Sequence, residues 1–142
     1  MSSLTAFAAF QAWFDANWLG TARRYAAETY QPPAPALTGE PAPFVYLDTT
    51  GDLFWQMSIG APGGNLQREE GRAIFEICVA TGSGASLPRG YAFALGRLLK
   101  GLRLAPGIAC REISLGIGGR FKHDGNYFAV PLVTRWQRDF KL

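Results

Sequence analysis

The sequence has few of the side chains on which metal and nucleophilic chemistry depend. It contains two cysteines, Cys78 and Cys110, and one histidine, His123. Two isolated cysteines do not make a disulfide framework, and each lies in an apolar run, so we expect free, buried thiols. One histidine and no Cys-x-x-Cys spacing give no reason to expect a metal site. A cysteine nucleophile would need a strand residue to meet His123 at a loop tip, so we expect no enzyme.

Charge and long apolar runs are also sparse. The chain has 14 basic and 11 acidic residues, a net charge of +3, and no basic run longer than Arg23-Arg24. A nucleic-acid interface normally appears as a clustered basic face, so we do not expect DNA binding. The apolar N-terminus lacks a preceding Lys or Arg and contains Asp15. A signal peptide needs a charged start and a membrane span needs about 20 apolar residues, so we expect neither.

The composition predicts a single packed domain that spans residues 1–142, because 48% of the residues are hydrophobic and 13% are aromatic. Ser3 is placed to cap a first helix over residues 4–19 that stops at Gly20. Trp13 falls outside the apolar stripe of this helix, so we expect surplus apolar surface that a loop or neighbouring subunit covers. The stripe consists of aromatic residues at helical spacing: Phe7, Phe10, Phe14 and Trp18.

Residues 20–43 contain the stretch QPPAPALTGEPAP and predict a semi-rigid, extended connection. The next segments, FVYLD and LFWQMSI, alternate across Thr50-Gly51-Asp52 and predict a β-hairpin. Residues 60–71 then read as a long polar loop. The apolar stretch RAIFEICVAT, which follows it, predicts a strand in the centre of the sheet.

A second helix is predicted from Ser86, as its cap, to Gly101, with leucines at helical spacing. Strands over 110–117 and 127–140 follow, separated by the turn sequence HDGN, and Pro131 predicts a bulge or an edge position. The expected order is α-β-β-β-α-β-β. It corresponds to a single α+β domain whose mixed or antiparallel sheet of about five strands carries two main helices.

The stretch ICVATGSGASLPRG places Gly82 and Gly84 between a strand and a helix, where phosphate-binding loops also begin. A dinucleotide fingerprint needs a third glycine where this chain has Leu87, and a Walker loop needs Gly-Lys-Ser/Thr, which is absent. A second cluster, GIGGRF, lacks the spacing as well. We therefore expect both clusters to shape turns and expect no cofactor.

Three parts of the sequence together resemble the tail terminator proteins of long-tailed phages, of the minor tail protein U type. They are the aromatic helix FAAFQAWFDANW with the Pro-rich crossing to PFVYLD, the segment GRAIFEICVATGSGASLPRGYAFALGRLLKG, and the closing DGNYFAVPLVTRWQRDF. The resemblance implies a structural protein without catalysis or cofactor. Such proteins form a ring, typically a homohexamer, at the head-proximal end of the virion tail.

The resemblance also implies partners. The ring stops polymerisation of the tail tube protein and presents the surface to which the head-completion (connector) protein joins. It assembles in the host cytoplasm, in a phage or phage-like particle, without a membrane, and DNA only passes through it as cargo. We expect the residues nearest a subunit or tube interface to lie on the first helix and in the 60–71 loop: Trp13, Trp18, Gly63, Gly64, Asn65, Leu66, Gln67 and Arg68.

Two other classes stay open. One is a different tail or neck component, such as a head-completion protein. The other is a small-ligand or nucleotide-binding domain that uses Gly82 and Gly84.

Overall fold

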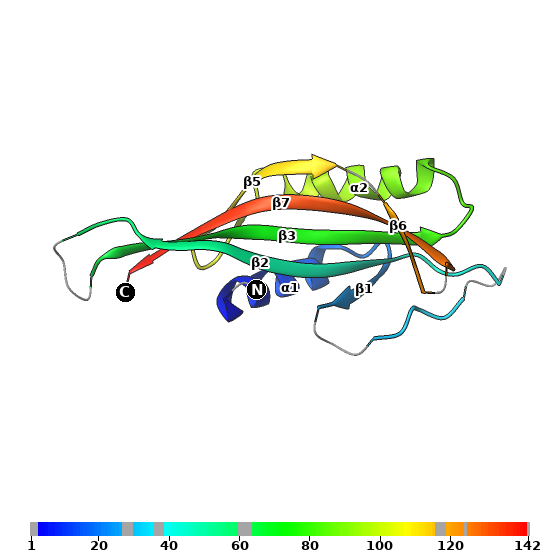
Figure 1. Cartoon of the computed structure of the whole chain (residues 1–142), viewed down its shortest axis with the longest axis horizontal. Helices are drawn as coiled ribbons and strands as arrows, with labels where there is room; N and C mark the ends of the chain where they lie inside the picture. Colours follow the sequence, from blue (N-terminus) through cyan, green and yellow to red (C-terminus); the bar gives the residue numbers. More distant parts are fainter. Residues whose placement is uncertain are drawn as a thin grey trace.

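The computed structural model describes residues 3–26, 30–35, 39–59, 64–115, 119–123 and 125–141. Two helices and one sheet form an α+β fold, with both helices behind the long strands in Figure 1. In chain order the elements are α1 (Leu4–Asn17), β1 (Ala22–Tyr25), β2 (Phe44–Gln56), β3 (Leu66–Ala80), α2 (Ser86–Leu99), β4 (Arg103–Leu104), β5 (Ile108–Leu115), β6 (Arg120–Lys122) and β7 (Tyr127–Lys141).

The sheet is mixed, which was one of the two expected alternatives; the other was a purely antiparallel sheet. Its strand order is β1-β2-β3-β7-β5-β4, and β6 pairs with β7 beside β5. The short strand β1 runs parallel to β2, whereas the other pairs are antiparallel. The expected α+β class with two main helices and a central third strand is confirmed. The three short strands β1, β4 and β6 were not expected from the sequence.

The main core lies between the helices and one face of the sheet. Phe14 of α1 packs edge-on to Phe75 with ring centroids 5.2 Å apart, and Phe10 lies 6.2 Å from Trp136. From α2, the core receives Ala92, Leu95 and Leu99. Because alternate strand residues point to opposite faces, only one set of side chains from β3 and β7 joins this core.

The first helix is fixed to the sheet at its N-terminus. Ser3 caps α1 as expected, since its hydroxyl accepts from the Ala6 N–H at 3.3 Å. The Ser3 backbone N–H and hydroxyl each donate to the buried Glu69 carboxylate at 2.8 Å. Arg138 forms an ion pair with the same carboxylate at 3.2 Å. The helix ends at Asn17, two residues earlier than expected, with Trp18 as its C-cap.

The expected hairpin at Thr50-Gly51-Asp52 is wrong. Strand β2 continues through this site with a bulge between Gly51 and Leu53. A Cβ atom on the facing Gly71 would lie 1.8 Å from the Thr50 carbonyl oxygen, so the two backbones meet closely here. Gly51 pairs with Gly71 and Leu53 pairs with Glu70, so the extra residue reverses which alternate residues of β2 face the core. This break in the alternation, together with the residues Thr50-Gly51-Asp52, made the local sequence resemble a turn.

Two further expectations need correction. The polar loop expected over 60–71 is strand from Leu66 onward, and residues 22–25 of the expected extended connection form β1. Ala85, not Ser86, is the N-cap of α2, and no side chain caps that helix. The edge position expected for Pro131 is confirmed, because β6 pairs with β7 up to Ala129 and β5 pairs from Leu132.

Candidate functional site

Strands β2, β3 and β7 extend beyond the helices as an arm, which we define as residues 53–59, 64–70 and 137–141. Figure 1 shows this arm at the end of the molecule where the C-terminus lies. The pairing runs to Gln56↔Gln67 on one side of β3 and to Leu66↔Lys141 on the other. The N-terminus of α1 reaches only as far as Glu69, so the outer part of the arm has no helix over it.

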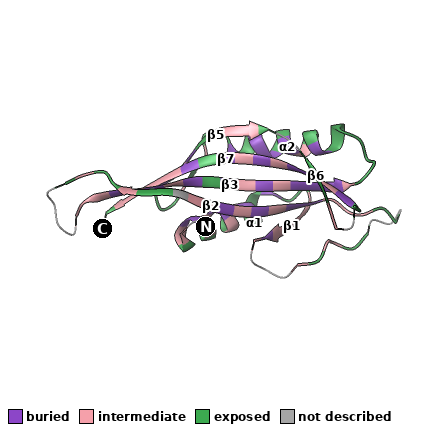
Figure 2. Ribbon diagram, in the orientation of Figure 1, coloured by how far each residue is buried: buried purple, intermediate pink, exposed green. Residues whose placement is uncertain are grey.

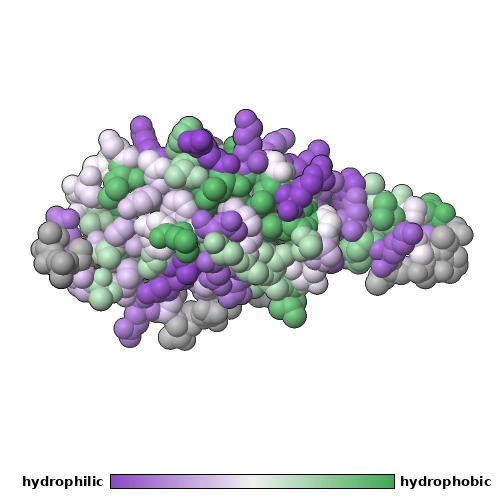
Figure 3. All heavy atoms as spheres, turned by 180° about the vertical axis from the view of Figure 1, so that it is seen from behind, coloured by the Kyte–Doolittle hydropathy of each residue, from purple (hydrophilic) through white to green (hydrophobic). Residues whose placement is uncertain are grey.

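Large apolar side chains are exposed along the arm. Leu53 and Phe54 are 57% and 59% exposed, Met57 is 42% exposed and Ile59 is 94% exposed. Leu53 and Phe54 are successive strand residues, so they point to opposite faces. Figure 2 shows little buried surface in this region, and Figure 3 shows apolar atoms on the arm among hydrophilic ones. Both faces of the arm therefore present apolar side chains to the surroundings.

Hydrogen bonds and ion pairs within the arm hold its strands together. Arg68 donates to both carboxylate oxygens of Asp139, at 2.6 and 2.8 Å, and this bond lowers the pKa of the Asp139 carboxyl. The Met57 N–H donates to the Leu66 carbonyl at 2.6 Å, and the Leu66 N–H donates to the Ser58 hydroxyl at 2.7 Å. These polar groups are paired inside the arm and add little to its outward contacts.

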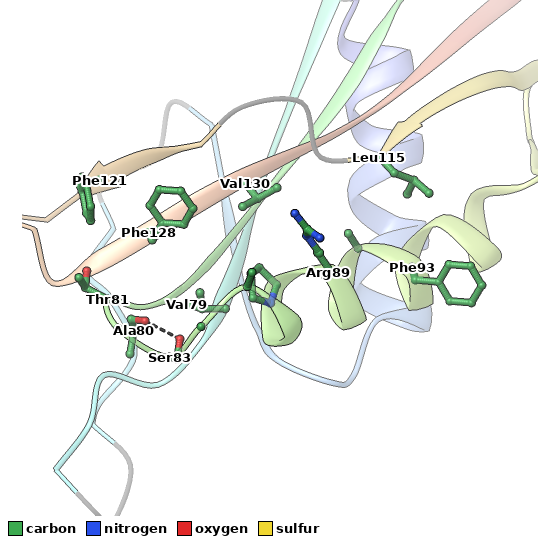
Figure 4. A pocket seen from close by; sticks show the side chains of 15 residues that line it. Val79, Ala80, Thr81, Ser83, Arg89, Phe93, Leu115, Phe121, Phe128 and Val130 are labelled. Atoms are coloured by element: carbon green, nitrogen blue, oxygen red, sulfur yellow. Dashed lines mark hydrogen bonds between the residues drawn. The ribbon is translucent and has the colours of Figure 1, made fainter.

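A groove lies at the other end of β3, between α2 and the ends of β5, β6 and β7. Its volume is about 880 Å³. Figure 4 shows the Arg89 guanidinium rising from α2 into the space below Val130. Most of the walls are apolar or glycine: Val79, Ala80, Gly82, Gly84, Ala85, Pro88, Ala92, Phe93, Leu115, Phe121, Phe128 and Val130.

The glycine-containing loop forms the end wall of this groove. Gly82 and Gly84 adopt φ of +87° and +86°, which L side chains rarely adopt, and this confirms their role in shaping the turn. The hydroxyl of Thr81 donates to the Gly125 carbonyl and that of Ser83 to the Ala80 carbonyl, the second bond being drawn in Figure 4. The Ser83 hydroxyl therefore closes the loop on itself, and the Thr81 hydroxyl joins the loop to the turn before β7.

The surplus aromatic surface expected on α1 is smaller than the sequence suggested. Trp18 is 5% exposed, packs edge-on to Tyr91, and donates its indole N–H to the Thr21 hydroxyl at 2.8 Å. Trp13 is half-buried and lies edge-on to Phe75 with centroids 6.5 Å apart. The burial of Trp18 agrees with its place in the apolar stripe of the first helix, and Thr21 and Tyr91 lie against it.

The loop residues expected at an interface lie in the arm. Leu66, Gln67 and Arg68 belong to β3, Gly64 and Asn65 precede it, and Gly63 lies outside the described residues. Gln67 is 7% exposed, with its side-chain amide 3.4 Å from that of Gln56. The sequence did not predict that the apolar residues at the end of β2 are exposed. Leu53 and Phe54 were expected in the second strand of a β-hairpin. The sequence feature that could have indicated their exposure is the run of apolar residues at successive positions, just before the polar residues 60–71.

Of the residues considered for chemistry, the two cysteines are buried and His123 is half-buried. Cys78 and Cys110 are free and buried, and burial raises the pKa of each thiol to about 12. His123 lies against the rings of Tyr30, Phe44 and Tyr127, with centroids 5.6 to 5.8 Å away. No group of three or more potential metal ligands occurs among the described residues, and no helix described is long and apolar enough to cross a membrane.

No protein-family model matches the sequence, and no curated protein matches it. One solved structure is similar along the full length: it covers 100% of this chain and 99% of its own, with 18% sequence identity and a TM-score of 0.61. At this level of identity the similarity establishes the fold alone.

Proposed function

We propose that this protein is a structural subunit of the tail terminator type, which forms a ring on the head-proximal end of a tail tube. In this proposal the ring stops tube growth and receives the head-completion protein. The observation that carries the proposal is the arm, a three-stranded extension with exposed apolar side chains on both faces. An arm of this kind serves contact with another protein rather than chemistry.

The apolar side chains at the outer end of the arm are not covered by any described part of the chain. A short strand ribbon gains little stability without a packed face, and exposed apolar patches of this kind mark protein interfaces. Full burial of a Leu, Phe, Met or Ile side chain stabilises by about 1.5–3 kcal/mol. Covering Leu53, Phe54, Met57 and Ile59 would therefore contribute several kcal/mol to assembly, in agreement with a protein that works as an oligomer.

The resemblance of the sequence supplies the specific assembly, and the chemistry of the described residues is compatible with it. Both thiols are held in the protonated form by burial, and His123 is enclosed by aromatic rings. The arm also contains Leu66, Gln67 and Arg68, which we expected from the sequence near a subunit or tube interface.

The test is tube assembly with this chain and its cognate tube protein. We expect the wild-type protein to yield tubes of uniform length, and the double variant Leu53→Ser, Met57→Ser to yield longer, heterogeneous tubes. A matched control is Leu98→Ser, because Leu98 is 44% exposed on α2, outside the arm and outside the groove lining. Its melting temperature and that of the arm variant should both stay near the wild-type value. Tubes of unchanged length with the arm variant would contradict the proposal.

A second candidate, a small-ligand or nucleotide-binding domain, is favoured by one observation. The loop with Gly82 and Gly84 borders a groove of about 880 Å³, a volume typical of ligand sites. A bound ligand raises the melting temperature by mass action, so a panel of nucleotides tests this candidate. We expect no shift. A reproducible increase with one nucleotide would favour the binding domain over the ring subunit.

A further inference from the structure

We propose that the arm of one copy docks into the groove of the next copy, so that the subunits associate head to tail. The inference rests on the proposed ring function and adds the two surfaces that would form each subunit contact. Both surfaces belong to this chain, and neither is covered in the structure described.

The positions of the two surfaces require a second chain. Strand β3 begins in the arm at Leu66 and ends at the groove at Ala80. Fifteen residues of strand span roughly 46 Å at about 3.3 Å per residue. Because β3 is paired along this length with both β2 and β7, the arm cannot fold back into the groove of its own chain.

The two surfaces match in chemistry and size. On the groove, Phe93 is 61% exposed, Leu115 is 52% exposed and Phe121 is 65% exposed. The arm offers four apolar side chains of similar exposure, with Ile59 at its outer end. A volume of about 880 Å³ has room for several of them, since sites of this size hold a whole drug-sized ligand.

One acidic residue on the arm and one basic residue at the groove have opposite charges. Arg89 is exposed at the groove and forms no ion pair within the part of the chain that the structure describes. Glu70 of the arm lies directly across from Leu53 on the same face and forms no ion pair with any described residue, although its charge acts on Arg68, and Arg111 and Arg135 line the same hollow. Insertion of the Leu53 face would bring a carboxylate toward the guanidinium. An acidic residue on the arm therefore fits a basic residue at the groove.

Symmetry favours this contact over pairing of two arms. A contact between different patches of one chain is heterologous, and it forms a closed ring when the rotation between neighbours closes. Each ring member would then use one arm and one groove, and every such surface would be covered. Association of two arms would leave the apolar groove open on both partners.

Disulfide trapping tests the contact directly. Met57→Cys is placed in one preparation and Phe93→Cys in another, and the two are mixed and oxidised. The native thiols do not compete, since both are buried. We expect the mixture to form crosslinked dimers at least several-fold above Met57→Cys alone and above a control mixture of Met57→Cys with Leu98→Cys. Predominant dimers from Met57→Cys alone, or a yield equal to the control, would overturn the proposal.

A charge exchange supplies a second, independent test. Glu70→Lys or Arg89→Glu alone should lower the crosslinking yield roughly two- to five-fold, as expected for a partly exposed ion pair. The two changes together should restore it. Additive losses in the double variant would refute the pairing of these two residues.

The inference and the proposed function fail in different ways. Tubes that stop at uniform length, capped by a protein whose arm and groove never crosslink, would overturn the contact and leave the function standing. Crosslinked rings that do not stop tube growth would support the contact and contradict the tail terminator function.

Discussion

At the scale of single residues, Glu69 links the first helix to the sheet. Its carboxylate accepts from the Ser3 N–H and hydroxyl and pairs with Arg138, although the residue is only 5% exposed. The sequence placed this glutamate in a polar loop, because nothing local distinguishes it from Glu70. Only the pairing of β3 with β7 brings Arg138 beside it.

Replacement of Glu69 should therefore lower the stability of the folded protein. Glu69→Ala should lower the free energy of unfolding by about 2–4 kcal/mol, because it leaves the Arg138 guanidinium without its partner and removes two bonds to Ser3. Urea denaturation measures the change. The exposed Glu112 serves as control, and Glu112→Ala should change stability by less than about 0.5 kcal/mol. Equal effects of the two substitutions would show that Glu69 does not anchor the helix.

The two cysteines give a prediction about reactivity and pH. Both thiols have pKa values raised to about 12 by burial, so only roughly one thiol in 10,000 is ionised at pH 8. We expect no reaction of the native protein with a disulfide reagent over an hour at pH 8, and two thiols titrated after unfolding. Rapid labelling of the folded protein would contradict the burial of Cys78 and Cys110.

The raised pKa values of the two thiols also affect the stability of the protein at high pH. The folded-state pKa of each thiol lies above its ordinary value of 9.0, so the folded chain favours the protonated form. This contribution to stability is complete below pH 9.0 and is lost as the pH rises toward 12. Replacement of both cysteines by alanine should flatten the fall in melting temperature above pH 9.0, and an unchanged slope would count against this origin.

At the scale of elements, the sequence identified those parts whose signal is local. Helix α1 has its cap at Ser3 and an aromatic stripe, α2 has leucines at helical spacing, and β7 shows strand composition over its full length. These elements were predicted with small errors at their ends. The sheet positions of β3 and Pro131 also followed from composition.

The arm could not be predicted because its features depend on pairing between distant residues. Thr50-Gly51-Asp52 has turn composition, yet β3 supplies a partner strand on both sides of it and makes it a bulge. The polar residues 66–70 have little strand character of their own, and they become strand because β2 and β7 flank them. Phe54 pairs with Glu69 on the face that carries the helices, so its exposure follows from the end of the helix layer, whereas Leu53 pairs with Glu70 on the opposite face. A single sequence reveals neither position.

The close packing at the bulge leaves no room for a side chain at Gly71. A Cβ atom there would meet the Thr50 carbonyl oxygen at 1.8 Å and Trp136 at 2.8 Å, so Gly71→Ala must displace backbone. We expect a loss of roughly 2–4 kcal/mol in unfolding free energy. The control is Gly90→Ala in α2, where nothing lies within 4 Å, and this change should stabilise by about 0.5–1 kcal/mol. A neutral Gly71→Ala would exclude close backbone contact at the bulge.

At the scale of the whole molecule, β3 joins two apolar surfaces at opposite ends. The body between them has its own core, which includes Phe10, Phe14, Phe75 and Trp136, and needs no partner to bury it. The arm and the groove are different, because apolar side chains of both are exposed in the described part of the chain, and in our proposal other copies cover them. In our proposal the subunit has contacts at both ends, which suits an assembly that closes on itself at the end of a tail tube.

The most direct measurement of this account is the position of the protein in the particle that contains it. We expect electron microscopy of isolated tails, labelled through an antibody fragment against the chain, to show label in a single ring at the head-proximal end. Label along the whole tube, at the distal end, on the head alone, or absent from tails would contradict the tail terminator function.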